Sequence, residues 1–169
     1  METFKVIDKL EKNQELFKTL LKDIHENQAK CKPSPAKWSV LEVVHHLYDE
    51  EREDFRLRLQ CTLANPEKKW ASIDPPQWVK DRKYNEQNFI DTATKFYEER
   101  EKSIKWLKHL QSPNWNNAHN HPSIGSISAG DLLVSWLAHD FLHFRQIITI
   151  NLEYLKVKTL PISTRYAMP

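Results

Sequence analysis

Apolar residues recur at intervals of three and four along four long stretches of the chain, with charged and polar residues between them. The stretches cover residues 3–28, 39 to about 63, about 85–110, and 128 to about 154. This spacing places the apolar side chains on one face of an α-helix, as in a helix that packs against a core. The pattern predicts an all-α protein built from four amphipathic helices.

Local signals mark where several of these helices begin or end. Residues 31–35 contain two prolines, which cannot continue a helix, so the first helix is expected to stop before them. Ser39 and Glu42 have the spacing of a capping box, in which each side chain binds the backbone N–H of the other residue. Ser128 is expected to cap the fourth helix, and Asp131 places an acidic group at the positive end of its dipole.

Two long connections separate the helices, at residues 64–83 and 111–127. Short loops would force neighbouring helices to run antiparallel, whereas connections of this length allow crossovers. The sequence therefore predicts a four-helix bundle with long crossover loops. Trp70 and Trp78 in the first connection either cover the mouth of a cavity or pack the loop against the bundle.

The composition agrees with a helical globular protein. Forty per cent of the 169 residues are hydrophobic and 28% are charged, and the two glycines are too few for the many tight turns of a β-rich fold. A chain of this length can bury a sizeable core. We expect one domain over residues 1–169, with a helical core at about 3–155 and an irregular tail at 156–169.

The charge balance and the cysteines narrow the classes of partner. The formal net charge is +2 and no basic run is present, so we expect no nucleic-acid or membrane partner. Cys31 and Cys61 are too few for a disulfide framework, and we expect reduced thiols in a cytoplasmic protein. The N-terminus lacks the apolar run of a signal peptide, and no stretch approaches the roughly 20 apolar residues of a membrane span.

The fourth stretch carries two histidines within its apolar face. Read as a helix, one stripe contains Leu132, Trp136, His139, His143, Gln146, Ile147 and Ile150. His139 and His143 lie one turn apart, so their imidazole nitrogens can reach a single metal ion. Burying two histidines costs less free energy if one ligand binds both. The pair predicts half of a metal site on the inner face of the bundle.

His46 is the best candidate for a third ligand, because it borders the apolar face of the second helix. Three imidazoles leave coordination positions open, as in catalytic sites, and they suit zinc, nickel or iron(II). His46, Glu50 and Asp54 are spaced by four and either line a cavity or form a salt-bridged edge, while His45 is expected to point toward solvent. Glu50 could act as a base toward water at the metal or orient a ligand.

Other polar residues have simpler interpretations. Arg100 lies near a core face, where an ion pair or a bond to a backbone carbonyl is more common than contact with a substrate anion. His119 and His121 lie in a polar loop with no rigid element to hold them, so we do not expect them to bind metal.

These motifs together resemble the DinB/YfiT-like superfamily of metal-dependent proteins, over about residues 5–155. The first motif of that family is similar to Trp38, Ser39, Glu42, His46, Leu47 and Glu50. Its second motif is similar to Leu132, Leu133, Trp136, His139, Asp140, His143, Arg145, Gln146 and Ile147. Its connecting pattern is similar to Trp78, Arg82, Tyr84, Arg100 and Trp115. One departure is Leu142, where many members carry an additional histidine.

The resemblance implies an up-down-down-up four-helix bundle with a metal triad at His46, His139 and His143. Members bind zinc, nickel or similar ions, and many are homodimers. Some are hydrolases or transferases that use a low-molecular-weight thiol such as bacillithiol, mycothiol or glutathione. The resemblance thus implies a metal-dependent hydrolase or thiol S-transferase acting on a small molecule. The family name refers to DNA-damage induction and does not imply DNA binding.

Two other interpretations remain open at this stage. The segment from His139 to His143 could be a relative of the HExxH zinc-protease motif with Asp140 in place of glutamate, but the second helix already supplies a third histidine. Alternatively, the protein is a non-catalytic helical bundle, a dimer that binds a metal or another ligand or a module with buried, metal-free histidines. Activity measurements with metal-loaded protein separate this class from an enzyme.

Overall fold

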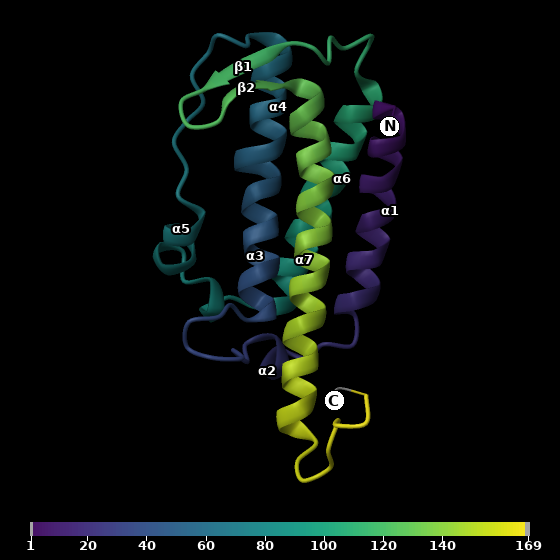
Figure 1. The fold of residues 1–169 in the computed structure, drawn as a ribbon, viewed down its shortest axis with the longest axis vertical. Helices are drawn as coiled ribbons and strands as arrows, with labels where there is room; N and C mark the ends of the chain where they lie inside the picture. The colour runs from purple at the N-terminus through teal and green to yellow at the C-terminus, as the bar shows by residue number, and fades with distance from the viewer. Residues whose placement is uncertain (1, 168–169) are drawn as a thin grey trace.

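The computed structural model describes residues 2–167, and most of them lie in helices (Figure 1). The helices are α1 (Thr3–Leu21), α2 (Glu26–Ala29), α3 (Val40–Asp49), the π-helix η1 (Glu50–Phe55), α4 (Arg56–Ala64), α5 (Pro75–Asp81), the 3₁₀-helix η2 (Tyr84–Glu86), α6 (Phe89–His109) and α7 (Ala129–Lys158). Two strands, β1 (Ala118–His121) and β2 (Gly125–Ser128), form an antiparallel pair.

Four long rods form the bundle: α1, the continuous run α3–η1–α4, α6 and α7 (Figure 1). In that view α1 and α7 run downward, whereas α3–η1–α4 and α6 both run upward. The segment after α4 descends alongside the bundle and carries α5 before α6 begins. This crossover lets the second and third rods run parallel. The predicted up-down-down-up bundle with long crossovers is confirmed.

Both predicted helix starts are present. The N–H of Ser39 donates to Glu42 Oε2 at 2.8 Å, and the N–H of Glu42 donates to Ser39 Oγ at 3.1 Å. Ser128 and Asp131 form the same reciprocal pair at 2.9 and 3.0 Å. Each pair satisfies two backbone donors at a helix start, and so fixes where the two rods that carry the histidines begin.

The structure corrects the predicted bounds of the helices. The first helix ends at Leu21 rather than at residue 28, and a turn leads into α2. Ile24 continues the apolar spacing but lies buried in that turn, so periodicity could not reveal the break.

The connection at 111–127 contains most of the hairpin β1–β2, so the fold is all-α apart from this small sheet. Gly125 has φ +77°, which favours glycine, at the turn of that hairpin.

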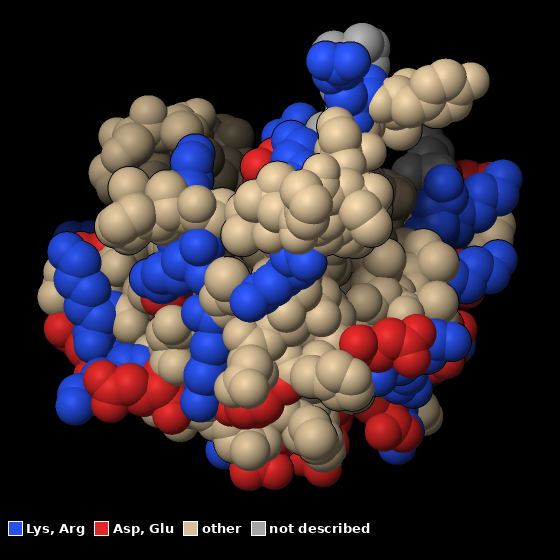
Figure 2. All heavy atoms as spheres, turned by 90° about the horizontal axis from the view of Figure 1, so that it is seen from below, with Lys and Arg blue, Asp and Glu red and all other residues tan. Residues whose placement is uncertain are grey.

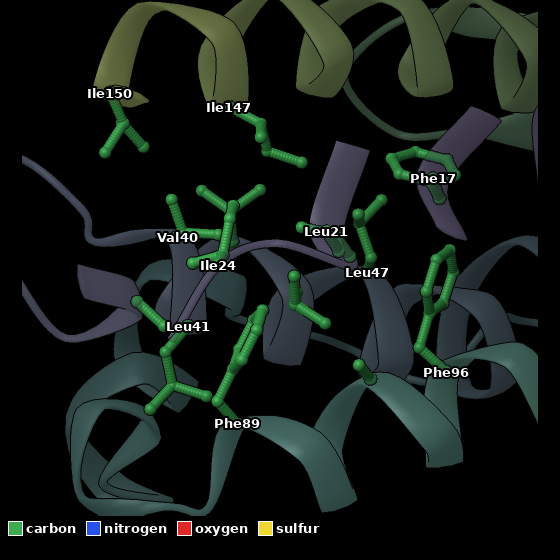
Figure 3. Close-up of a cluster of buried hydrophobic side chains, with 14 of the residues drawn as sticks. Phe17, Leu21, Ile24, Val40, Leu41, Leu47, Phe89, Phe96, Ile147 and Ile150 are labelled. Carbon is green, nitrogen blue, oxygen red and sulfur yellow. The ribbon is translucent and has the colours of Figure 1, made fainter. Parts of the chain in front are cut away.

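A polar layer divides the hydrophobic core into two clusters. The lower cluster joins the ends of α1 and α6 to α3 and α7 (Figure 3) and includes Phe17, Leu21, Val40, Leu47, Phe96 and Ile147. The upper cluster includes Val6, Leu10, Leu59, Ile104, Leu133 and Trp136. Along every rod the residues between the two clusters include a buried polar group, namely Asn13, Glu51, Arg100 and Asp140. The candidate histidines of α3 and α7 lie close to this polar layer.

Arg100 is the centre of the polar layer and is 1% exposed. Its Nη1 and Nη2 donate to the two carboxylate oxygens of Asp140 at 2.8 and 2.7 Å, and its Nε donates to Glu51 at 2.9 Å. Asn13 Nδ2 donates to the same Asp140 at 2.9 Å, and Trp136 Nε1 donates to Glu51 at 3.0 Å. The predicted ion pair of Arg100 is therefore present, and its network joins all four rods.

The surface carries charges of both signs at the end of the molecule seen in Figure 2. In that view Asp and Glu side chains lie mostly along the lower edge and the sides, whereas Lys and Arg side chains lie at the edge and also across the middle, among uncharged residues. Within residues 2–167, the helices are too short or too polar to cross a bilayer.

Replacing Arg100 with methionine is expected to destabilise the protein by about 3–5 kcal/mol, because the carboxylates of Asp140 and Glu51 would remain buried without their cation. Urea unfolding followed by circular dichroism measures the change. Lys105→Met on the same helix removes an exposed cation and is the matched control, with an expected effect below about 0.5 kcal/mol. Equal stability of the two variants would contradict a structural role for the network.

Candidate metal centre

Three imidazole rings from two rods meet at one point inside the bundle. His46 comes from α3, and His139 and His143 come from successive turns of α7. The Nε2 atom of His139 lies 3.3 Å from that of His46 and 3.0 Å from that of His143. All three candidate ligand atoms lie within 4.8 Å of one another. Among residues 2–167, these three histidines are the one group of histidine, cysteine or carboxylate side chains close enough together to hold a metal ion.

The spacing of the nitrogens fits a metal ion. Ligands at 2.0–2.1 Å from a tetrahedral ion lie about 3.3 Å from one another. The two measured separations that involve His139 are 3.3 and 3.0 Å, close to this value. A neutral imidazole offers one lone pair, and three lone pairs facing one another repel unless a cation or a proton lies between them. The donor set and its geometry therefore suit a divalent cation.

Burial keeps these imidazoles in the neutral form that binds metals. Desolvation, followed by the charge of His143, lowers the pKa of His46 to about 3. Desolvation and the neighbouring His143 and His46 lower the pKa of His139 to about 2, and burial also lowers the pKa of His143. All three side chains consequently present lone pairs at neutral pH, so a cation need not displace protons in order to bind.

Neighbouring side chains orient the rings. His143 Nδ1 donates to Gln146 Oε1 at 2.8 Å, which leaves the lone pair on Nε2, the nitrogen that faces the other two histidines. Trp38 packs against His46 with ring centroids 5.0 Å apart, and Phe55 packs against His139 at 4.9 Å. Gln146 was on the predicted stripe, and its position three residues after His143 is the sequence signal for this contact.

Glu50 lies behind His46 rather than among the three nitrogens. Its Oε1 is 3.9 Å from His46 Nδ1, and both atoms are buried without a hydrogen-bond partner within residues 2–167. Burial, followed by a hydrogen bond with Asp54, raises the pKa of Glu50 to about 9. Asp54 pairs in turn with Arg58 at 2.7 Å. At Asp54 the predicted polar row is therefore a salt-bridged edge.

The π-helix η1 places acidic side chains on two sides of the second rod. It begins at Glu50, one turn after His46, and ends at Phe55, which contacts His139. The wider turn of a π-helix accommodates one extra residue, and such bulges are frequent at functional sites. Glu50 and Glu51 are adjacent in sequence, yet Glu50 faces the His46 side and Glu51 reaches Arg100. Periodicity alone could not reveal this insertion.

His45 does not point to solvent as predicted. Its ring stacks on that of Tyr84 at 4.1 Å, and its Nδ1 lies 3.6 Å from Asp49 Oδ2. The crossover covers this face of α3, because Tyr84 donates to Asp49 at 2.6 Å and Arg82 pairs with Asp49 at the same distance. The crossover is thus attached to the rod that carries His46.

The remaining aromatic and histidine residues of the connections lie away from the three imidazoles. The guanidinium of Arg82 packs on the ring of Trp78, with its central carbon 4.2 Å from the ring centroid. Trp78 therefore holds the crossover in place. Trp70 stacks on His119, with ring centroids 4.2 Å apart. His119 and His121 both belong to β1 and lie beside Trp70. Cys31 and Cys61 are free thiols.

The fold and the site together define a class of protein: a helical bundle with three converging histidines, two of them buried and His139 partly buried. Residues 9–147 match the family model of the DinB superfamily, and the chain belongs to this family. It is similar to an Oceanobacillus iheyensis protein named "putative metal-dependent hydrolase", with 27% identity over 148 residues that cover 85% of this chain and 83% of that protein.

A solved structure shares the fold. YfiT from Bacillus subtilis, described as a probable metal-dependent hydrolase with an unusual four-helix bundle topology, superposes with a TM-score of 0.78. The match covers 88% of this chain and 85% of YfiT, at 19% sequence identity. At this identity the likeness concerns the arrangement of the helices.

Proposed function

We propose that this protein is a metal-dependent hydrolase that uses His46, His139 and His143 as the ligands of one divalent ion. The convergence of three Nε2 atoms at 3.0 and 3.3 Å carries the proposal. Three protein ligands leave at least one coordination position open, which distinguishes a catalytic site from a closed structural one. The relative from Oceanobacillus iheyensis, whose name includes hydrolase activity, supports the same class.

A divalent ion bound here would supply Lewis-acid activation of water, and its own charge would lower the pKa of that water toward neutrality. The three imidazoles hold the ion, and Gln146 keeps the ring of His143 in the ligating tautomer. Glu50 lies behind His46, 3.9 Å from its Nδ1, and orients that ring as a ligand from the side opposite the ion. Trp38 and Phe55 exclude water from the sides of the site that they cover.

Zinc, nickel and iron(II) all suit a site of three imidazoles, and we propose one of these as the physiological ion. Ligand chemistry alone does not select among the three. In a second candidate reaction, a low-molecular-weight thiol would lose its proton to solvent, and its sulfur would form a bond to a substrate carbon as a leaving group departs with its electron pair. The divalent ion would supply stabilisation of the thiolate charge. The hydrolytic reaction has more support, because the relative from Oceanobacillus iheyensis is named a putative metal-dependent hydrolase.

The exposed face of α7 supports a homodimer. Val134, Phe141, Ile148 and Leu155 are spaced by seven and are 47–53% exposed. Apolar residues with a seven-residue repeat are typical of helices that pack against another helix. A second copy of α7 related by a two-fold axis presents the same stripe, so the face is self-complementary. We propose that two chains associate through this stripe, whether or not the protein is catalytic.

Purified protein reconstituted with zinc, nickel or iron(II) is expected to bind about one ion per chain, because three neutral imidazoles converge. Metal analysis by mass spectrometry after desalting measures the stoichiometry. His139→Ala is expected to lose the ion, and His121→Ala, a histidine outside the group, is the matched control. Equal metal content in both variants would remove the assignment of the triad.

Metal-loaded protein is expected to hydrolyse members of a panel of small esters and amides, and Glu50→Gln is expected to lower kcat/KM about 10–100-fold, because Glu50 orients His46 from behind. Glutamine keeps the shape of the carboxyl group but cannot ionise. Glu153→Gln on the exposed side of α7 serves as the control. Parallel assays with glutathione and bacillithiol detect thiol transfer. Activity no higher than that of the free ion, with and without thiol, would favour the non-catalytic bundle.

The double substitution Phe141→Asp with Ile148→Asp is expected to convert a dimer into a monomer, because it places charges in the centre of the stripe. Light scattering coupled to size-exclusion chromatography measures the mass. Ile90→Asp, which alters an equally apolar exposed residue on α6, is expected to leave the dimer intact. A parent protein that is monomeric at about 100 μM would contradict this part of the proposal.

A further inference from the structure

A pocket lies between residues 66–73 and β1 with the turn after it. Figure 1 shows β1 at the upper end of the bundle. The pocket there has a volume of about 590 Å³, within the range of pockets that bind small molecules. Its lining comes from α4, from the segment that follows α4, and from β1 with the turn after it. The three imidazoles of the candidate metal centre do not contribute to that lining.

The wall of the pocket is built from packed aromatic and cationic side chains. The ring of Trp70 contacts His119 at 4.2 Å and the guanidinium of Arg58 at 4.8 Å, measured from ring centroids. His119 is buried, and its Nδ1 donates to the carbonyl of Pro66 at 2.8 Å, which ties the hairpin to the segment after α4. The wall therefore has a defined shape before any ligand binds.

The pocket presents several hydrogen-bond donors that lack acceptors within residues 2–167. The ammonium of Lys69 forms no ion pair, and Arg58 uses its Nε for Asp54 while neither Nη group is bonded. The Nδ1 of His121 accepts the N–H of Ser123 at 3.2 Å, so the neutral ring carries its proton on Nε2. The indole N–H of Trp70 is inside the wall itself, buried without an acceptor, so Lys69, Arg58 and His121 are the donors that a ligand can reach.

Carboxylates are scarcer than cations along the same lining. Glu67 is the one acidic residue among the side chains that line the pocket, and Asp54, which pairs with Arg58, is not part of the lining. Two permanent cations and additional N–H donors around a concave, partly apolar surface form the chemistry that recognises carboxylate and phosphate groups.

From this arrangement we infer that the pocket binds the carboxylate or phosphate group of a small molecule, with Lys69 and Arg58 as its principal contacts. The inference goes beyond the proposed hydrolysis and does not depend on it, because no residue of the pocket is a proposed metal ligand. The two sites are nevertheless connected. Arg58 pairs with Asp54, and Asp54 contacts Glu50 beside His46.

The test uses the indole N–H signal of Trp70 in a two-dimensional nitrogen–proton spectrum, assigned with Trp70→Phe. Inorganic phosphate and succinate are the probes, and sodium chloride at equal ionic strength is the control. We expect a saturable shift of the Trp70 signal with at least one probe. A response to phosphate alone identifies a phosphate site, a response to succinate alone identifies a carboxylate site, and a response to both supports recognition of anions in general.

Lys69→Met is expected to weaken this binding about tenfold or more, because it removes a charged hydrogen-bond donor to the anion. Lys68→Met makes the same change of charge at the neighbouring residue, which does not line the pocket, and is expected to bind normally. No saturable shift, or equal weakening in both variants, would overturn the inference. Repeating the titration with His139→Ala separates the outcomes, because loss of the metal site would leave anion binding intact.

Discussion

The ion network of Arg100 is the interaction on which the arrangement of the bundle depends. It joins α6 to Asp140 of α7, to Glu51 of η1 and, through Asp140, to Asn13 of α1. Burial alone would lower the pKa of Arg100, but the carboxylates of Asp140 and Glu51 outweigh it and raise the pKa. The guanidinium therefore stays charged inside the protein, and each of the four rods has one favourable position along the bundle axis.

This network also holds the metal-binding residues in register. Asp140 follows His139 directly, and Glu51 follows Glu50 one turn after His46, so the anchored residues lie next to the functional ones. Such a network is a weak source of stability, since replacing buried ion pairs with apolar residues of similar volume is often neutral or stabilising. An apolar layer would, however, allow the rods to slide by a turn. The polar layer exchanges some stability for a defined meeting point of three imidazoles.

Much of this arrangement could be predicted from local patterns. The four rods follow from apolar spacing, the starts of two rods from their caps, and the grouping of His139 with His143 from one turn of helix. His46 could be proposed as the third ligand only by assuming a helical bundle, because His46 and His139 are 93 positions apart and no local pattern links them. The partners of Arg100, the position of His45 and the hairpin at β1 could not be predicted, since each depends on contacts between segments distant in sequence.

The π-helix has a further consequence for how this second rod can change during evolution. Because η1 holds one residue more than an α-helix of the same rise, deleting a single residue there would restore regular winding rather than break the rod. Because the deleted residue is the one that the wider turn absorbs, the residues after it would keep their orientation relative to α3. Leu59 would stay in the upper core, and Arg58 would stay against the ring of Trp70. The second rod can therefore lose one residue at this turn and keep its packing, whereas a deletion elsewhere in the rod would rotate every following residue by about 100°.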